Sequence, residues 1–331
     1  MTTGNYEKFA PFENRLDLSA LLEKVASIQS EIKKVIVGQE QMIELLLITL
    51  LTGRHSIIEG VPGVAKTLTA RLLAQVVDTG FSRIQFTPDL MPSDITGTSI
   101  LNIKNNVFEF IEGPIFSNIV LIDEINRAPA KTQAALFECM AENQVSVDGI
   151  THQLNDPFMV IATQNPIEQE GTYKLPEAQL DRFLFKIIVE YPSFEEEVEL
   201  IYRHHKREKP AENIKLEACI NEDEILYFKN LIQKIYVHEQ IIEYIAKIVY
   251  KTRNSSHLLL GASPRASIAI LEASKALAAI NGRDFVTPED IKYVLYPIIG
   301  HRVILTPERE MEGFNTKSII MQIIESVEIP R

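Results

Sequence analysis

The sequence predicts an α/β fold in which a central parallel sheet is covered by helices, followed by a smaller domain made of helices. First, short runs rich in β-branched and apolar residues alternate with helical patterns between residues 55 and 192. Second, a glycine-rich loop, GVPGVAKT at residues 60–67, directly follows the first of these runs and opens a helix. Third, the strand pattern ends at Tyr191-Pro192, after which helical spacing takes over. Runs that are apolar on both faces are typical of strands buried inside a parallel sheet.

Two helices are expected before the glycine-rich loop, after a flexible segment at residues 1–15. From Leu18 to Val35 apolar residues recur at helical spacing, which predicts a helix with one buried face. Gly38 ends this pattern. Residues 39–53 are apolar on most sides and predict a helix that is buried nearly all round.

The sheet and its insertions follow. The expected strands lie at residues 55–60, 82–87, 119–124, 158–163 and 185–192. Two other segments predict β-hairpins, one at 97–113 turning at Asn105-Asn106 and one at 144–154 turning at Asp148-Gly149. Because the sheet needs neither hairpin, both are candidate working loops.

The chain is expected to divide near residue 192. Residues 16–192 form the predicted α/β core, and residues 193–331 form the predicted helical domain. Two late helices carry a clear start signal, because Ser263-Pro264 and Thr287-Pro288 each place a hydroxyl at the N-cap before a proline at the first helical position.

The composition is that of a globular protein with an ordinary core. A length of 331 residues suggests two or three domains. Hydrophobic residues make up 46% and charged residues 24% of the chain, both ordinary values. The net charge of -12 and the pI of about 5.2 disfavour a general nucleic-acid binder, although a local basic channel stays open as an alternative.

The cysteines and the N-terminal region bear on the compartment. Cys139 and Cys219 lack the spacing of a metal motif and are expected to be buried free thiols in a reducing compartment. No signal-peptide pattern opens the sequence. The most apolar run, Met42–Leu51, is too short to span a bilayer and contains Glu44. A cytoplasmic location is therefore expected.

The glycine-rich loop predicts a phosphate-binding site. Its backbone N–H groups and the following helix N-terminus can surround phosphate oxygens. Lys66 can supply a charge to the β- and γ-phosphates, and Thr67 can offer a hydroxyl to Mg²⁺. A glycine turn that happens to precede a lysine is the plainer interpretation.

Ala65 departs from the common pattern G-x-x-x-x-G-K-[ST], which has glycine before the lysine. The site could be intact with a tolerated change, or it could have lost its chemistry. An intact site predicts a negative φ at Ala65, where a methyl group is permitted, and leaves Gly63 as the position that needs glycine. A positive φ at Ala65, or a Lys66 turned away from the loop, would favour the lapsed site.

Acidic and amide side chains follow two later strands. Asp123 and Glu124 end the run IVLIDE, where an aspartate can hold the Mg²⁺ shell and a glutamate can polarise water. Solvated loop acids are the alternative, weakened by the wholly apolar strand before them. Asn165 follows the run FMVIAT and could bind the attacking water or the γ-phosphate, although Asn165-Pro166 alone is simply a turn.

Three arginines are candidates for phosphate contact. Arg182 follows Asp181 at the end of a predicted short helix. Arg265 lies in the first turn of a helix, where a cation gains nothing from the helix dipole, so an anion is expected nearby. For both, function is preferred over a surface ion pair of little energy. For Arg127, the two interpretations have equal weight.

The motifs occur in an order that resembles the MoxR-type AAA+ ATPases, from about Gly38 to about Arg302. The matching stretches are GVPGVAKT, QFTPDLMPSDITG, LIDEINRAP, ATQNP, LPEAQLDRF and GASPRA. The resemblance implies a P-loop NTPase with an αβα sandwich, a helical lid, and a homo-oligomeric ring, a hexamer, with ATP and Mg²⁺ bound between subunits. In this family the residue before the lysine agrees with Ala65.

The resemblance also implies roles for single residues. Asp123 and Glu124 correspond to Walker B, with Asp123 and Thr67 on the Mg²⁺ side, and Asn165 corresponds to sensor 1. Arg182 corresponds to the arginine finger and Arg265 to sensor 2. The two hairpins correspond to inserts that contact the client. The implied nucleotide-binding residues are Val37, Gly38, Gly60, Val61, Pro62, Gly63, Val64, Ala65, Lys66, Thr67, Leu68 and Asp123.

The implied function is ATP-driven, chaperone-like remodelling or activation of a partner complex, with metal or cofactor insertion as one such task. A separate protein with a von Willebrand factor A domain is the implied partner, and a protein is the implied client. One alternative is an ATP-controlled assembly scaffold with little turnover, against which Glu124 and Arg182 count. Another is a DNA-dependent ATPase, which the acidic balance disfavours.

Overall fold

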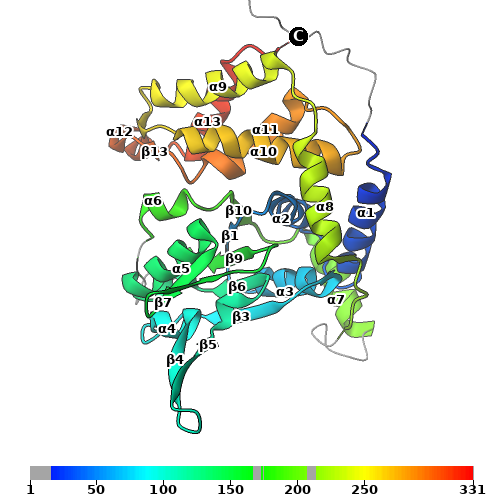
Figure 1. Ribbon diagram of the computed structural model, residues 1–331. Helices are drawn as coiled ribbons and strands as arrows, with labels where there is room; N and C mark the ends of the chain where they lie inside the picture. Colours follow the sequence, from blue (N-terminus) through cyan, green and yellow to red (C-terminus); the bar gives the residue numbers. More distant parts are fainter. Residues whose placement is uncertain (1–15, 167–172, 174, 207–213, 331) are drawn as a thin grey trace, which may run out of the picture.

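The computed structural model describes residues 16–166, 173, 175–206 and 214–330. A layered α/β core carries a group of helices on one side and two long hairpins on another (Figure 1). The prediction of flexibility for residues 1–15 lies outside the described residues.

The central sheet is parallel and has the strand order β10-β1-β9-β6-β3. Each strand matches one of the expected apolar runs within a few residues, so the predicted parallel sheet is confirmed. Side chains in β6 and most of β9 are buried, as two covered faces require. The strands are β1 (Ser56–Gly60), β3 (Phe81–Gln85), β6 (Ile119–Asp123), β9 (Met159–Gln164) and β10 (Phe185–Val189).

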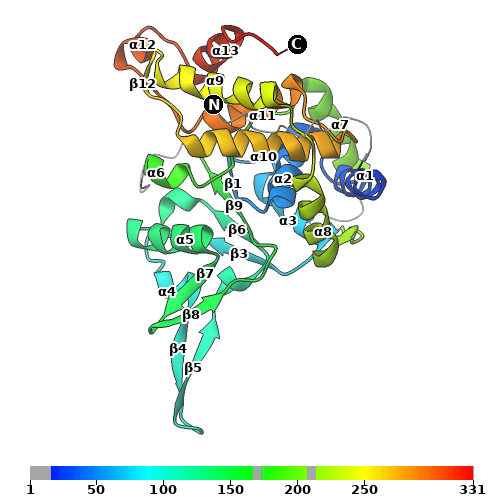
Figure 2. The same ribbon diagram turned by 45° about the horizontal axis from the view of Figure 1, so that its top comes forward.

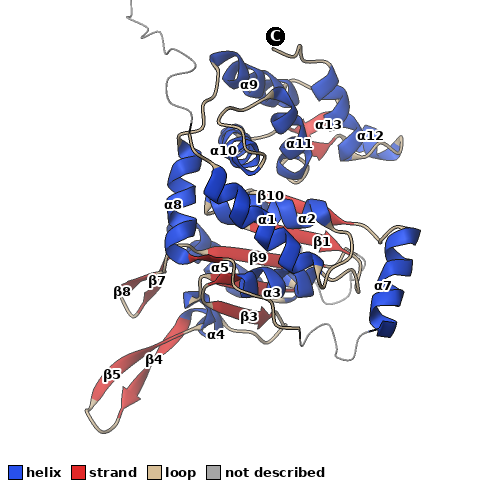
Figure 3. Cartoon of the chain, turned by 90° about the vertical axis from the view of Figure 1, so that its right-hand side faces the viewer, coloured by secondary structure: helices blue, strands red, loops and turns tan. Residues whose placement is uncertain are grey.

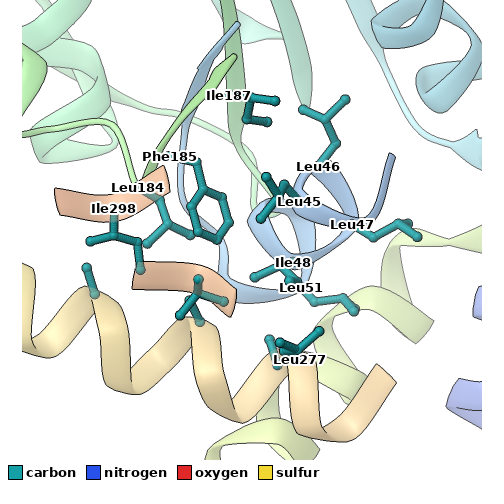
Figure 4. Packing of buried hydrophobic residues seen from close by; sticks show 14 of the residues in the cluster. Leu45, Leu46, Leu47, Ile48, Leu51, Leu184, Phe185, Ile187, Leu277 and Ile298 are labelled. Atoms are coloured by element: carbon teal, nitrogen blue, oxygen red, sulfur yellow. The ribbon is translucent and has the colours of Figure 1, made fainter. Parts of the chain in front are cut away.

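Helices from the first half of the chain cover the sheet. The expected all-round apolar helix is α2, which packs against β10 and the later helix α10. Figure 4 shows why it is apolar on most sides, since Leu45, Leu46 and Ile48 lie among side chains from the sheet and from two later helices. The helices are α1 (Ser19–Lys33), α2 (Glu40–Thr52), α3 (Lys66–Val76), α4 (Pro92–Thr96), α5 (Ala130–Glu142) and α6 (Glu177–Leu180), with 3₁₀ turns at Pro114–Phe116 and Ile125–Arg127.

Both expected hairpins are present. The first pairs β4 (Gly97–Asn102) with β5 (Val107–Glu112), and the second pairs β7 (Gln144–Val147) with β8 (Ile150–Gln153). Positive φ angles of 51° and 79° at Asp148 and Gly149 give the second one its tight turn. The hairpins touch through Phe110 and His152, whose rings stack with centroids 4.1 Å apart. Figure 3 shows both hairpins projecting beyond the core.

The region after residue 192 is mostly helical, as predicted, with very short strands that carry too few residues for a visible pattern. The N-caps expected at Ser263 and Thr287 are confirmed. The elements are α7 (Phe194–Lys206), β11 (Ile220–Asn221), α8 (Glu222–Gln233), α9 (Glu239–Arg253), β12 (Leu258–Leu260), α10 (Pro264–Ile280), α11 (Pro288–Ile299), β13 (Ile304–Leu305), α12 (Pro307–Met311) and α13 (Thr316–Glu325).

The first part of this region lies against the core. β11 pairs in parallel with β2 (Val77–Asp78), and α8 packs on α2. The helices α9 to α13 form the separate group above the sheet (Figure 2), called the lid below. The division at residue 192 therefore stays a prediction.

Both cysteines are free thiols. Cys139 is buried, and burial raises its pKa to about 12, so it is chemically inert at neutral pH, whereas Cys219 is partly exposed. Along the described ranges, no helix is both long and apolar enough to cross a bilayer. The expected cytoplasmic location stays a prediction.

His55, just before β1, is a buried histidine with a fixed tautomer. Its Nδ1 accepts from the Val160 amide at 3.0 Å, so Nε2 carries the proton and donates to the Met140 carbonyl at 3.1 Å. A second proton, on Nδ1, would break the hydrogen bond from the Val160 amide. Burial lowers the His55 pKa from 6.5 to about 4.

Acidification is expected to destabilise the fold through this residue. The unfolded chain binds the proton from pH 6.5 downward and the folded chain only near pH 4, so stability is lost as pH falls through this window. The His55 share is about 2 kcal/mol between pH 7 and pH 5. Urea unfolding at several pH values should show a flatter pH dependence in His55→Gln than in the wild type. An unchanged pH dependence in His55→Gln would contradict the role given to His55. Part of the pH dependence that remains in the variant comes from buried His301, whose pKa is also lowered by burial.

Candidate active site

A cavity of about 780 Å³ lies at the carboxyl ends of the sheet strands. This is the edge at which parallel α/β sheets bind ligands. The α1–α2 turn, the glycine-rich loop, the ends of the strands and one face of α7 line it. The lining residues are Val35, Ile36, Val37, Gln39, Pro62, Gly63, Val64, Ala65, Lys66, Thr67, Leu68, Arg71, Arg83, Gln85, Leu121, Asp123, Glu124, Thr163, Gln164, Asn165, Pro192, Leu200, Arg203 and His204.

Most of the nucleotide-binding residues expected from the sequence line this cavity, and three do not. Gly60 ends β1, and Val61 follows it, both behind the lining part of the loop. Gly38 has a φ of +68°, which favours glycine, and the Glu196 carboxylate lies against it, so a side chain there would be strained and would displace Glu196. Gly38, Gly60 and Val61 therefore support the residues that line the cavity and do not line it themselves.

The prediction of a negative φ at Ala65 is wrong. Ala65 has φ +61° and ψ 21°, a left-handed conformation, and Gly63 has φ +88°. Left-handed residues among right-handed ones turn successive backbone N–H groups toward one side, which makes an anion-binding concavity. The loop therefore needs this conformation at position 65, and the methyl group of alanine costs about 1–2 kcal/mol of strain.

Of the two signs that would indicate a lapsed site, one is present and one is absent. The φ of Ala65 is positive, but Lys66 stays over the loop and donates through Nζ to the carbonyls of Gly60 and Val61. A positive φ is also what a glycine at this position would adopt. The angle thus reports strain within the loop and does not separate an intact site from a lapsed one.

Asp123 is the buried centre of a polar network. Its Oδ1 accepts from the hydroxyls of Thr67 at 2.9 Å and Thr163 at 3.1 Å. Its Oδ2 accepts from Nε of Arg83 at 2.7 Å. The side chain is only 6% exposed, so the carboxylate depends on these donors.

The Thr67–Asp123 pair fits Mg²⁺. A hydroxyl and a carboxylate oxygen lie side by side at the loop, and both are the hard donors that Mg²⁺ prefers. Over the described residues, no group of three or more His, Cys, Asp or Glu side chains could form an all-protein metal cage. Mg²⁺ commonly keeps only one or two protein ligands and takes the rest from phosphates and water.

Glu124 is turned off the end of β6 by a positive φ of 58°. Its amide donates to the Thr163 hydroxyl at 3.1 Å, and its Oε2 accepts from Nε2 of Gln85 at 2.7 Å. Nε of Arg127 lies 3.2 Å from the same oxygen. The structure therefore places Arg127 in an ion pair with Glu124.

Sequence reasoning missed Arg83, Gln85 and Thr163. Arg83 and Gln85 had a signal, because SRIQFT alternates polar and apolar residues where a fully buried strand would not, whereas Thr163 ends an apolar run. Arg83 and Gln85 point from β3 to the neighbouring strand end, where Asp123 and Glu124 lie. Asn165, which was expected, lines the cavity and is 8% exposed.

Arg182 and Arg265 do not line the cavity. Arg182 donates through Nη1 to the Phe137 carbonyl at 3.0 Å, near the end of α5. Arg265 is 70% exposed, and its Nη1 lies 3.6 Å from Oδ2 of Asp181. Arg265 thus pairs with Asp181, the residue that precedes Arg182, and both arginines lie outside the cavity that Lys66 lines.

Asp181 is held by a buried arginine of the lid. Arg302, whose side chain is 4% exposed, donates through Nε to Oδ1 of Asp181 at 2.7 Å. Its Nη2 donates to the carbonyls of Asp181 and Phe183 at 3.1 and 2.6 Å, and its Nη1 to those of Leu184 and Ile298 at 3.1 and 2.5 Å. The guanidinium fixes the whole segment that follows Arg182.

Arg302→Leu is expected to cost about 3 kcal/mol or more, because a partly buried carboxylate and four carbonyls lose their donor. Urea unfolding would measure the loss. Arg309→Leu is the matched control, since Arg309 pairs with Glu312 on the surface and should cost less than about 0.5 kcal/mol. Equal losses in the two variants would contradict the structural role of Arg302.

Comparisons with known proteins agree with this fold. Residues 55–185 match the family model described as "ATPase family associated with various cellular activities (AAA)", and residues 250–323 match the model described as "AAA lid domain". A phosphate-binding loop on a parallel sheet, followed by such a lid, defines the AAA+ class. The second match begins within α9, where the lid begins in the structure.

Relatives narrow the class to a family. "Chaperone MoxR1" of Mycobacterium tuberculosis is 44% identical over 91% of this chain and 81% of its own length. "Uncharacterized protein YeaC" of Bacillus subtilis is 47% identical over 95% of this chain and 96% of its own length. A solved structure of a putative ATPase from Cytophaga hutchinsonii superposes with a TM-score of 0.86 at 45% identity, covering 94% of this chain and 97% of that one. The chain belongs to the MoxR-type AAA+ ATPases.

Proposed function

We propose that this protein binds Mg·ATP in the cavity, hydrolyses it to ADP and phosphate, and uses the cycle to remodel a partner protein. The observation that supports this most is the network at the strand ends. There Asp123 binds Thr67 of the phosphate loop, and Glu124 and Asn165 line the same cavity. If these residues had only a structural role, the site would not need Glu124 beside the buried Asp123.

Each residue has a defined task in this proposal. The loop amides and Lys66 bind the phosphates, and Thr67 and Asp123 hold Mg²⁺, which neutralises charge on the phosphate oxygens when bound. Glu124 accepts the proton of the attacking water, and Asn165 orients that water. The bond from the γ-phosphorus to its bridging oxygen breaks, and ADP leaves as the second product.

Arg182 and Arg265 are proposed to act on the nucleotide of a second copy. Neither lines the cavity of its own subunit: Arg182 donates to the Phe137 carbonyl, and Arg265 pairs with Asp181, the residue before Arg182. A homo-oligomeric ring, a hexamer in this proposal, would bring these arginines to the neighbour's cavity. Arginines supplied from a partner are an established way to stabilise charge in phosphoryl transfer.

Lys66→Ala tests the site. The variant is expected to bind ATP at least about tenfold more weakly and to lose about 100-fold or more of its turnover, since it removes the point charge on the phosphates. Isothermal titration with an ATP analogue and a phosphate-release assay would measure both. Lys229→Ala is the control, because Lys229 pairs with Asp156 outside the cavity. A wild type that releases no phosphate at any protein concentration would end the proposal.

The remodelling role is supported by the relatives named as chaperone or MoxR proteins. We propose a separate partner with a von Willebrand factor A domain, a protein client contacted by the two hairpins, and metal or cofactor insertion as one task. The Glu124→Gln form, kept in Mg·ATP, is the suitable bait. Release of the captured protein when ADP replaces ATP would support the role, and nucleotide-independent capture would count against it.

A further inference from the structure

The apolar face of helix α7 points away from the core, which is unusual for a helix of an isolated subunit. Four of its five apolar residues fall at positions i, i+4, i+7 and i+8, which is one continuous stripe that faces solvent, and the fifth, Leu200, lines the cavity. An amphipathic helix ordinarily turns this face to the core. The stripe consists of Phe194 (76% exposed), Val198 (50%), Ile201 (60%) and Tyr202 (52%).

The inner face of α7 is polar instead. Glu196 lies against Gly38, Arg203 donates through Nη1 to the Lys33 carbonyl at 2.8 Å, and Nε of Arg203 binds Glu199 at 2.7 Å. None of the helix residues is fully buried. The Lys33 bond joins the helix to the core, and the Arg203–Glu199 pair lies within the helix itself, while the apolar stripe is exposed.

The apolar stripe borders the nucleotide cavity. Leu200, Arg203 and His204 line the cavity from the same helix, so the stripe and the cavity mouth form a continuous surface. An exposed stripe of this kind indicates a binding surface.

A second surface lies on the opposite side of the molecule. In Figures 1 and 2, α7 lies at the right, whereas α6 and α12 lie at the left. On that left side, exposed Arg265 lies close to three exposed apolar residues of β12 and α10, which are Leu259 (67%), Leu260 (45%) and Ile268 (54%). Glu195 and Glu197 border the N-terminal end of the α7 stripe, so this end is opposite in charge to Arg265, whereas the C-terminal end of the helix is basic.

We propose that the α7 stripe docks on the Leu259, Leu260 and Ile268 surface of a second copy of this chain. The inference rests on the proposed function, which requires a second copy to carry Arg182 and Arg265 to the cavity mouth. The two halves are different surfaces, so the contact is head-to-tail and repeats from subunit to subunit. Nucleotide binding and assembly thus share helix α7, with the nucleotide on one face and the neighbour on the other.

The first test places a charge on the stripe. Ile201→Asp in the Glu124→Gln background, with Mg·ATP, should require at least about tenfold more protein to assemble, because a desolvated carboxylate would lie in the contact. Sedimentation velocity across a protein dilution series would measure this. Ile242→Asp is the matched control, since Ile242 is 49% exposed on α9 and lies outside both surfaces. Thermal unfolding of Ile201→Asp should match the wild type, because the side chain is exposed in the subunit.

The second test mixes two defective subunits. Ile201→Asp and Leu259→Asp should each fail to assemble alone, and their mixture should form dimers, because one intact pair of surfaces remains. If Leu259→Asp assembles like the wild type while Ile201→Asp does not, α7 contacts something else and the proposed pairing is overturned. Assembly of Ile201→Asp like the wild type overturns it too. Lower thermal stability in Ile201→Asp and in a chain lacking residues 1–15, with assembly unchanged, would assign the stripe to that segment instead.

These outcomes separate the inference from the proposed function. A wild type that assembles through Ile201 yet releases no phosphate ends the proposed function and leaves the contact standing. A wild type that releases phosphate while Ile201→Asp assembles and turns over normally ends the contact and leaves the ATPase. A wild type that stays monomeric with Mg·ATP at all protein concentrations ends the contact.

Discussion

Arg182→Ala is expected to lower ATP turnover about a thousandfold while each subunit still binds ATP. The physical reason is that the guanidinium stabilises charge that develops on the γ-phosphate only in the transition state. Because Arg182 lies away from the cavity of its own subunit, its removal leaves that cavity intact. Phosphate release measures the loss, and titration with an ATP analogue measures the retained binding.

Mixing experiments show whether Arg182 acts on the nucleotide of its own subunit or on that of a neighbour. If it acts on a neighbour, Arg182→Ala subunits added to wild type should lower turnover in the cavities of the wild-type subunits beside them. The double variant Arg182→Ala·Lys66→Ala should stay inactive in such mixtures, because its own cavity lacks Lys66. Activity restored by combining Arg182→Ala subunits with Lys66→Ala subunits would support action between copies. No restoration, together with strictly proportional loss in wild-type mixtures, would contradict it. Arg309→Ala, a surface arginine beside Glu312, is the control.

Glu124→Gln is expected to lower turnover by about 100-fold or more while ATP stays bound. The amide keeps the shape of the side chain and can still accept from Gln85, but it cannot take the proton of the attacking water. Single-turnover phosphate release, measured beside ATP binding, separates the two effects. Glu142→Gln, on the exposed end of α5, is the matched control.

The same measurement decides between a motor and a scaffold. An ATP-controlled scaffold with little turnover would show the slow rate of Glu124→Gln already in the wild type. A clear difference between the two rates supports hydrolysis as part of the function. Equal rates would favour the scaffold.

The sheet was predictable because most of its strands are nearly continuous apolar runs, and such runs have few other folds available. The second hairpin was predictable because Asp148-Gly149 is a pair that adopts positive φ readily. The core of the site was predictable for a related reason. Lys66, Asp123 and Asn165 each follow an apolar strand, and parallel strands bring their carboxyl ends to one edge.

Other features depend on contacts between distant parts of the chain. The conformation of Ala65 is set by the loop as a whole, so the residue type alone pointed to the wrong sign of φ. The outward face of α7 has the same periodicity as an inward one, and only the fold shows which way it points. Arg265 is far in sequence from Asp181, the residue before Arg182, and their pairing follows from how the lid sits on the core.

Asp181 joins the lid to the segment that carries Arg182. Its carboxylate and the carbonyls beside it are bound by Arg302, and the exposed Arg265 lies against its other oxygen. Tilting the lid relative to the sheet would break these bonds or carry residues 181–184 with it. In a ring, such a tilt would withdraw Arg182 from the neighbour. Through the bonds at Asp181, a change at one site would then set when the next site is active, so that subunits would hydrolyse ATP in succession rather than at random.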